Sequence, residues 1–334
     1  MPGLGTSFGR GGATTAQQDL VNADAILIMG SSMAEQHPVG FRFVVQAREH
    51  GATVIHVDPR YTRTSAMANL WVPIRPGSDI VFLGGMINFV LEHGREFREY
   101  VAHYTNAGVI LRDDVQLPDE LDGFFSGWNP ELRKYEADSW LYRGAARRER
   151  EEADEDPAVG GHGKDRGGDA PDLGEVERDP TLEHPRCVFQ LLKRHFSRYT
   201  PEMVERACGV PREQFLRVAD IFSSASGRDR TAAICYAVGW TQHSVGVQII
   251  RSAAILQLLL GNIGRPGGGI LALRGHASIQ GSTDIPTLYD ILPGYLPMPV
   301  LGTDSASLEA YNRAHTTRTG WWANFPKYSV SLLK

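Results

Sequence analysis

Two short runs of apolar residues constrain the fold of this chain more than any other feature. Ala25–Met29 reads A-I-L-I-M and Thr53–Val57 reads T-V-I-H-V, so neither run shows the polar alternation of a strand with one solvent-exposed face. Between them, residues 41–50 carry apolar side chains at helical spacing before Gly51. Strand, helix and strand at this spacing indicate a right-handed βαβ crossover. We therefore expect an α/β fold with a doubly wound, mostly parallel sheet.

The same reasoning predicts later elements. Ser78 is a suitable N-cap for a helix over 80–91, and Thr200 is one for a helix over 201–207. Apolar spacing predicts further helices over 187–196, 212–223 and 245–260, and a strand over 232–238. The glycine-dense residues 262–269 are predicted to form a loop.

A change in composition divides the chain. Residues 145–178 are rich in Glu, Asp, Arg, Gly and Pro, and they offer almost no apolar surface to bury. This predicts a disordered surface loop, with a charged linker between two domains as the alternative. We expect a dinucleotide-like α/β domain in two parts, 1–110 and 184–274, separated by an insertion, 111–183. Residues 275–334 would begin a second, truncated α/β domain.

Charge and cysteine content exclude several classes of function. The 34 basic and 39 acidic residues give a net charge of -5, which argues against a nucleic-acid partner. No apolar run reaches the roughly 18 residues that a membrane-spanning helix needs, so direct membrane insertion is not expected. Cys187, Cys208 and Cys235 lie far apart with no C-x-x-C pair. They cannot build a zinc or iron–sulfur site alone, and we interpret them as buried or idle thiols.

Four turns marked by glycine or proline follow or border predicted strands: 30–38, 58–63, 76–79 and 239–243. Ligands of open α/β sheets bind at the carboxyl ends of strands, so together these turns indicate a large anionic ligand. Taken singly, each could be an ordinary turn. Asp58, just past a strand, could accept hydrogen bonds from nucleotide ring N–H groups or ribose hydroxyls. Asp79 could do the same, or simply complement the dipole of its helix.

A polar island, L-R-G-H-A-S-I-Q-G, occupies residues 273–281. Arg274 lies beside a glycine, so a small carboxylate could approach its guanidinium and accept two parallel hydrogen bonds. A structural ion pair is an equally good interpretation of Arg274. His37, His243 and His276 show no metal-ligand spacing, and we interpret His37 as a structural histidine.

Longer motifs resemble a known family. M-G-S-S-M-A-E-Q-H-P-V-G-F at 29–41, V-D-P-R-Y-T-R-T at 57–64 and P-I-R-P-G-S-D-I at 73–80 resemble the large subunit of molybdopterin-dependent oxidoreductases. G-W-T-Q-H-S-V-G at 239–246, L-L-L-G-N-I-G-R-P-G-G-G at 258–269 and the island at 273–281 resemble respiratory formate dehydrogenases of the selenocysteine type. The resemblance covers nearly the whole chain and fails mainly across 145–178.

This resemblance implies a bis-molybdopterin guanine dinucleotide cofactor carrying molybdenum or tungsten. It implies thirteen cofactor-binding residues: Met29, Gly30, Ser31, Ser32, Glu35, Asp58, Arg60, Thr62, Gly77, Ser78, Asp79, Val238 and Gln242. It also implies that Arg274 orients formate beside the metal and that His276 borders the same pocket. The two-part α/β domain would then be the cofactor-binding domain.

In such enzymes formate is oxidised to carbon dioxide and the electrons pass to a [4Fe–4S] cluster. The resemblance implies that the metal ligand (selenocysteine or cysteine) and the cluster domain lie upstream of Met1, so this chain would be an internal fragment without a metal ligand of its own. We expect Met1 to follow an in-frame UGA codon and the isolated fragment to be inactive. Implied partners are an iron–sulfur beta subunit and a membrane gamma subunit, with a periplasmic location or one at the outer face of the membrane. Two alternatives remain: another molybdopterin oxidoreductase, such as a nitrate reductase, or a non-catalytic cofactor-binding fragment.

Overall fold

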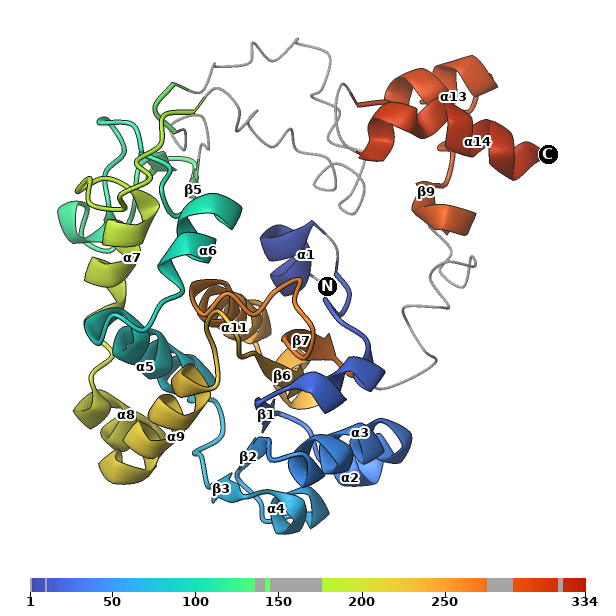
Figure 1. Ribbon diagram of the computed structural model, residues 1–334. Coiled ribbons are helices and arrows are strands. Elements are labelled where there is room, and N and C mark those ends of the chain that lie inside the picture. Colours follow the sequence, from blue (N-terminus) through green and yellow to red (C-terminus); the bar gives the residue numbers. More distant parts are fainter. Residues whose placement is uncertain (1, 10, 136–141, 145–175, 275–290, 318–320) are drawn as a thin grey trace. The chain divides into compact units, whose positions relative to one another are not determined.

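The computed structural model describes residues 2–9, 11–135, 142–144, 176–274, 291–317 and 321–334 (Figure 1). They belong to two compact units. Unit 1 comprises residues 1–143 and 177–275, and unit 2 comprises 144–176 and 276–334. Residues 145–175 of the predicted disordered loop, and the predicted pocket residue His276, lie outside the described residues.

A five-stranded parallel sheet forms the centre of unit 1, with strand order β3-β2-β1-β6-β7. The strands are β1 (Ala25–Met29), β2 (Thr53–Val57), β3 (Leu70–Val72), β6 (Ala232–Tyr236) and β7 (Gly269–Ala272). The chain runs outward from β1 to β3 and returns to pair β6 with the other side of β1. The predicted α/β fold with a parallel, doubly wound sheet is confirmed. Its topological switch point lies between β1 and β6.

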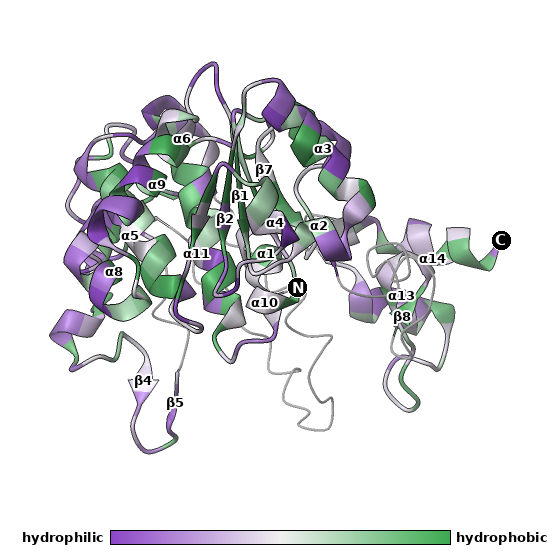
Figure 2. Cartoon of the chain, turned by 90° about the horizontal axis from the view of Figure 1, so that it is seen from below, coloured by the Kyte–Doolittle hydropathy of each residue, from purple (hydrophilic) through white to green (hydrophobic). Residues whose placement is uncertain are grey.

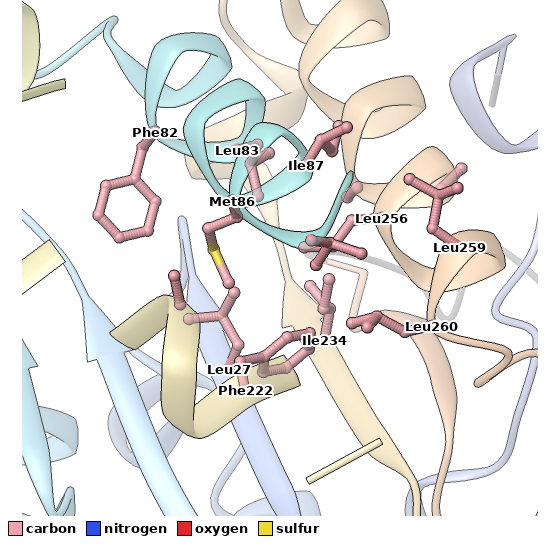
Figure 3. Close-up of a cluster of buried hydrophobic side chains, with 14 of the residues drawn as sticks. Leu27, Phe82, Leu83, Met86, Ile87, Phe222, Ile234, Leu256, Leu259 and Leu260 are labelled. Carbon is pink, nitrogen blue, oxygen red and sulfur yellow. The ribbon is translucent and has the colours of Figure 1, made fainter. Parts of the chain in front are cut away.

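Helices cover both faces of this sheet (Figure 2). Ile26 and Ile28 of β1 pack in the core of the face that α3 (Pro38–Glu49) covers. Leu27 points to the other face, where it meets Met86 of α5 (Asp79–Glu92), Phe222 of α9 (Arg212–Ser224) and the side chains of α11 (Gly246–Leu259) (Figure 3). Burial on both faces explains the unbroken apolar run of β1.

The other described elements of unit 1 are short. They are α1 (Pro2–Phe8), α2 (Met33–Gln36), α4 (Arg63–Met67), α6 (Arg98–Tyr104), α7 (Val188–Phe196), α8 (Pro201–Cys208), α10 (Val238–Thr241), β4 (Trp128–Asn129), β5 (Lys134–Tyr135) and the 3-10 turns η1 (Gln17–Asn22) and η2 (Pro118–Glu120). The helices predicted at 187–196, 201–207, 212–223 and 245–260 are confirmed to within about one residue at each end. Thr200 is the N-cap of α8, as predicted, and its hydroxyl accepts a hydrogen bond from Met203 N at 3.2 Å.

Two local predictions differ from the structure, one in the end of a strand and one in the hydrogen bond of a cap residue. The strand predicted over 232–238 ends at Tyr236, and Val238 begins α10. Gly30 O accepts hydrogen bonds from Ala237 N at 3.3 Å and Gly239 N at 3.0 Å, which turns the chain out of the sheet. Ser78 is the N-cap residue of α5, as predicted, but its hydroxyl donates to Arg75 O at 2.6 Å and caps no helix N–H group.

Two edge strands, β3 and β7, were not predicted. Each is only three or four residues long, too short for a periodic signal. β7 begins at Gly269, the last residue of the predicted loop. Its outer edge is covered by the N-terminal segment, where Thr14 N donates to Ile270 O at 3.0 Å and Thr14 Oγ1 accepts from Ile270 N at 2.9 Å. A contact between residues 256 positions apart cannot be read from local sequence.

The described residues of unit 2 are 144, 176, 291–317 and 321–334. This unit contains β8 (Ile291–Leu292) paired antiparallel with β9 (Leu296–Pro297), the 3-10 turn η6 (Pro293–Tyr295), α13 (Leu308–His315), η7 (Trp321–Asn324) and α14 (Phe325–Leu333). Its small core consists of Leu296, Tyr311 and Phe325. Its one buried carboxylate, Asp304, lies 2.5 Å from His315 Nε2 among the described residues.

The three cysteines are free and buried, as predicted. Complete burial raises the pKa of the Cys235 thiol to about 12, so it stays protonated and unreactive. Within the part of the chain that the structure describes, we find no helix with the length and apolar character needed to cross a bilayer.

Candidate functional site at the carboxyl edge of the sheet

Because all five strands are parallel, their carboxyl ends share one edge of the sheet. Every predicted site residue among the described ones ends a strand or follows one at this edge. Met29, Gly30, Ser31, Ser32 and Glu35 belong to β1 and the segment after it; Asp58, Arg60 and Thr62 follow β2; Gly77, Ser78 and Asp79 follow β3; Val238 and Gln242 follow β6; Arg274 follows β7. The fold thus brings together five loops that are widely separated in sequence.

Two glycines join the loops at the switch point. Gly30 has φ +71°, a left-handed conformation that disfavours other residues, and its carbonyl oxygen accepts from Gly239 N at 3.0 Å. A Cβ atom at Gly239 would lie 2.6 Å from Gly30 O. The backbones therefore touch here, and both positions require glycine.

Asp79 links the loops that follow β3 and β6. It is buried in the first turn of α5, and Trp240 Nε1 donates to its Oδ1 at 3.1 Å. Trp240 is fully buried, so this contact is shielded from water. Burial, the largest effect, raises the pKa of the Asp79 carboxyl, and the Trp240 hydrogen bond partly opposes it.

An Asp79→Asn variant should therefore gain stability over the wild type as pH rises. The folded protein binds the Asp79 proton more tightly than the unfolded chain does, so raising the pH through the aspartate range costs the wild type folding free energy. Asparagine does not titrate and can still accept from Trp240. Urea unfolding of both proteins between pH 4 and pH 8 measures the difference, and a difference that shrinks with pH would contradict the assignment.

Glu35 ties the loop after β1 to α4. Its Oε1 accepts from Arg63 N at 2.8 Å and its Oε2 from the Thr64 hydroxyl at 3.1 Å. A carboxylate at the first turn of a helix also complements the helix dipole. Both oxygens are therefore engaged with α4, and Glu35 shapes the rim of the site by holding that helix.

A pocket with a cavity volume of about 450 Å³ opens beside Glu35. Its lining consists of Glu35, Arg60, Tyr61, Thr62, Arg63 and Ala66. Tyr61 is 64% exposed. Its ring packs edge-to-face against the ring of Trp71, with the two ring centroids 5.1 Å apart. Two guanidinium groups and an exposed ring suit a ligand that combines negative charge with an aromatic base.

Arg274 has an unusual setting at the end of β7. Its φ is +65°, a left-handed conformation that is uncommon for arginine, and its carbonyl oxygen lies 2.5 Å from His37 Nε2. The guanidinium donates to Gly11 O, while its buried Nε has no partner among the described residues. No carboxylate in the described ranges forms an ion pair with Arg274, so the structural ion pair is not found there. Among the described residues, the His37 ring forms a hydrogen bond through Nε2, while its buried Nδ1 has no partner.

The edge carries buried polar atoms that lack protein partners within the described residues. They are Ser31 Oγ, His37 Nδ1, Thr62 Oγ1 and Arg274 Nε. Gly77, with φ +83°, has no atom within 4 Å of a Cβ placed there, so its backbone faces open space. Buried polar groups are almost always hydrogen-bonded. The unsatisfied donors and acceptors at this edge of the sheet therefore fit a bound polar ligand.

Sequence reasoning missed two residues of this edge, His56 and Trp240. Both are fully buried and bonded to predicted site residues or their neighbours. The only local signal for His56 was a titratable side chain inside an otherwise apolar strand. Among the described residues, no three His, Cys, Asp or Glu side chains converge as a metal site.

Comparison with known proteins identifies the class. Residues 5–324 match the molybdopterin oxidoreductase family, so this chain belongs to that family. The family implies a molybdopterin-type cofactor with molybdenum or tungsten, which agrees with the unsatisfied polar groups at the sheet edge.

Among its relatives, the chain is 44% identical over 338 residues to the nitrate-inducible formate dehydrogenase major subunit of Escherichia coli, covering 99% of this chain and 30% of the relative. It is 45% identical over 337 residues to formate dehydrogenase 2 subunit alpha (cytochrome c-553) of Nitratidesulfovibrio vulgaris, with the same coverage. An F420-dependent formate dehydrogenase alpha subunit of Methanococcus maripaludis is 28% identical over 315 residues, which are 94% of this chain and 33% of that protein.

The chain thus spans about 30% of the length of these two curated formate dehydrogenase subunits. Among solved structures, acetylene hydratase from Pelobacter acetylenicus matches with a TM-score of 0.44 and 17% identity, over 77% of this chain and 25% of that one. This likeness is too weak to bear on function.

Proposed function

We propose that this chain is part of the catalytic subunit of a formate dehydrogenase and holds a bis-molybdopterin guanine dinucleotide cofactor at the carboxyl edge of its sheet. The observation that supports this most is the convergence of five strand ends on one edge with unsatisfied buried polar atoms. The names of the relatives support formate as the substrate.

Each loop of this edge would bind a different part of such a cofactor. Asp58 and Asp79 would accept hydrogen bonds from N–H groups of guanine or pterin. Polar atoms of the ligand would form hydrogen bonds with Ser31, Ser32 and the exposed backbone at Gly77. A guanosine group of the cofactor would bind in the pocket beside Arg60. Thr62, Val238 and Gln242 lie on the same edge.

When bound, the metal centre supplies the redox chemistry by taking the two electrons released as formate becomes carbon dioxide. The role of this chain would be to orient the substrate. Arg274 would bind the formate carboxylate through its guanidinium, of which Nε has no protein partner among the described residues. The contact with Gly11 O and the contact of His37 with the Arg274 carbonyl would hold this side chain and its backbone in place.

The electron path and the surroundings belong to the same proposal. An adjacent [4Fe–4S] cluster would accept the electrons, and an iron–sulfur beta subunit and a membrane gamma subunit would carry them onward. The name "major subunit" among the relatives supports the presence of smaller subunits. A location at the periplasmic, outer face of the membrane rests on the resemblance to the respiratory group.

Purification of the native protein from its own organism, followed by metal and pterin analysis, tests the proposal. We expect molybdenum or tungsten with about two guanine-linked pterins per metal, and formate-dependent but not nitrate-dependent turnover. Metal and pterin with nitrate turnover would establish the nitrate reductase alternative. Cofactor without either turnover would support a non-catalytic binding role, and absence of metal and pterin would refute the proposal.

A further inference from the structure

His56 places a polar imidazole in the middle of an otherwise apolar strand. It belongs to β2 and is 0% exposed, with Val54, Ile55 and Val57 around it in the strand. Burying an imidazole without hydrogen bonds is costly. Both of its nitrogens are bonded: Nδ1 lies 2.9 Å from Ser65 Oγ, and Nε2 lies 3.2 Å from Ser31 O. The side chain therefore reaches from β2 to the loop after β1 and to α4.

The partners decide which nitrogen carries the hydrogen. A carbonyl oxygen can only accept, so Nε2 must donate to Ser31 O. Ser65 Oγ already accepts from Thr62 N at 2.9 Å, and its own hydrogen has Nδ1 at 2.9 Å or Arg60 O at 3.5 Å as acceptors. The shorter contact makes Nδ1 the acceptor. The result is a directed chain of hydrogen bonds from Thr62 N through Ser65 and His56 to Ser31 O.

Burial supports the neutral imidazole that this chain requires. Desolvation, the largest effect, lowers the pKa of His56, while the carboxylates of Asp58 and Glu35 and the bond to Ser31 O oppose it. Asp58 Oδ2 lies 3.8 Å from Nε2, so the same N–H group also faces a predicted ligand of the cofactor.

We propose that His56 is a positioning residue that joins the loops after β1 and β2, and so sets Ser31 and Asp58 for cofactor binding. This inference rests on the proposed function. Asp58 Oδ1 is held by Arg60 N at 2.8 Å, whereas its Oδ2 has only the imidazole beside it among the described contacts. Without the imidazole, the Ser31 carbonyl would lose a buried donor, and the two loops would be joined through Glu35 and the bond from Ala34 N to the Thr64 hydroxyl.

The test compares His56→Phe with Val54→Ala in the native, full-length protein. Both residues lie on β2 with side chains on the same face, but Val54 is near the amino end of the strand, away from the site. Amide hydrogen exchange and the molybdenum and pterin content are measured for both variants. We expect His56→Phe to exchange at least tenfold faster in 30–36 and 58–65, with unchanged rates in β1 and β6, and to lose severalfold in cofactor content. Val54→Ala should lower global stability while leaving the exchange of these loops and the cofactor content as in the wild type.

A second variant, Ser65→Ala, leaves the strand intact and decides the matter if His56→Phe does not fold. It should speed amide hydrogen exchange in residues 30–32, because Ser65 is linked to Ser31 O through His56. The double variant carries both His56→Phe and Ser65→Ala. Its loss of cofactor should be no greater than that of the more severely affected single variant, because both substitutions interrupt the same chain of hydrogen bonds. Additive losses, or unchanged exchange of 30–32 in Ser65→Ala, would overturn the inference. A wild type without metal or pterin would refute the proposed function, but the exchange rates would still decide the role of His56.

Discussion

Replacement of Arg274 by lysine should raise KM for formate about ten- to hundredfold in the intact enzyme while changing kcat much less. Lysine keeps the positive charge but cannot offer a planar pair of parallel N–H donors to a carboxylate. The loss of one charge-assisted hydrogen bond costs roughly 1.5–3 kcal/mol, which corresponds to this range of affinity. Arg274 is suited to the role because its Nε has no partner in the described part of the protein. Steady-state kinetics with formate as the varied substrate provide the measurement.

Arg230→Lys is the matched control. Arg230 precedes β6 and so lies at the amino end of the sheet, where its side chain is 62% exposed and pairs with Asp24 at 3.8 Å. An exposed pair of this kind contributes little to stability, and we expect its replacement to leave KM unchanged. If Arg274→Lys and Arg230→Lys gave the same KM as the wild type, Arg274 would have no role in binding formate.

Gly239→Ala should destabilise the protein by roughly 1–3 kcal/mol and abolish cofactor retention, although alanine is the better helix former. Gly239 lies in α10, so helix propensity alone predicts stabilisation. The added Cβ, however, would lie 2.6 Å from Gly30 O and 2.7 Å from Gly30 Cα. Backbone atoms cannot rotate away as a side chain would, so the loops after β1 and β6 must separate. The midpoint of urea unfolding and the molybdenum content measure the two effects.

Gly5→Ala separates packing from propensity. Gly5 also lies in a helix, α1, but its added Cβ would meet only Gly11 N at 3.8 Å, an ordinary contact. This variant should be as stable as the wild type or more so, by up to about 1 kcal/mol. Should Gly239→Ala stabilise the protein as Gly5→Ala does, the close approach of the two loops at the switch point would be refuted.

Local sequence predicted the elements that depend on local physics. The strands β1 and β2 were predicted with their observed bounds, because a run buried on both faces must be apolar at every position. The helices α7, α8, α9 and α11 were predicted because their apolar residues recur at helical spacing. Residues after the strands were predicted as a binding edge, since the carboxyl ends of parallel strands must lie together. The family resemblance added a molybdopterin-type cofactor, which the family match supports, and the prediction that formate is the substrate.

Other features depend on contacts between distant parts of the chain. Both oxygens of Glu35, a predicted cofactor contact, also bond to α4, which begins 28 residues later. Ser78 is the N-cap residue of α5, as predicted, but its hydroxyl donates to Arg75 O and caps no helix N–H group. β7 is too short to be recognised alone and depends on pairing with β6 and with Thr14. Hydrogen bonding decides all three, and a polar side chain chooses its partner only after folding has placed the alternatives within about 3 Å.

The sequence by itself therefore determined a parallel α/β sheet and the edge at which the candidate site residues gather, because hydrophobic periodicity and strand direction are local properties of the chain. Only the tertiary structure decided what those residues do there. It showed that Gly30 and Gly239 meet, that His56 joins two loops and that the Nε of Arg274 has no protein partner among the described residues. These are distances between groups far apart along the chain, and they exist only once the sheet has formed.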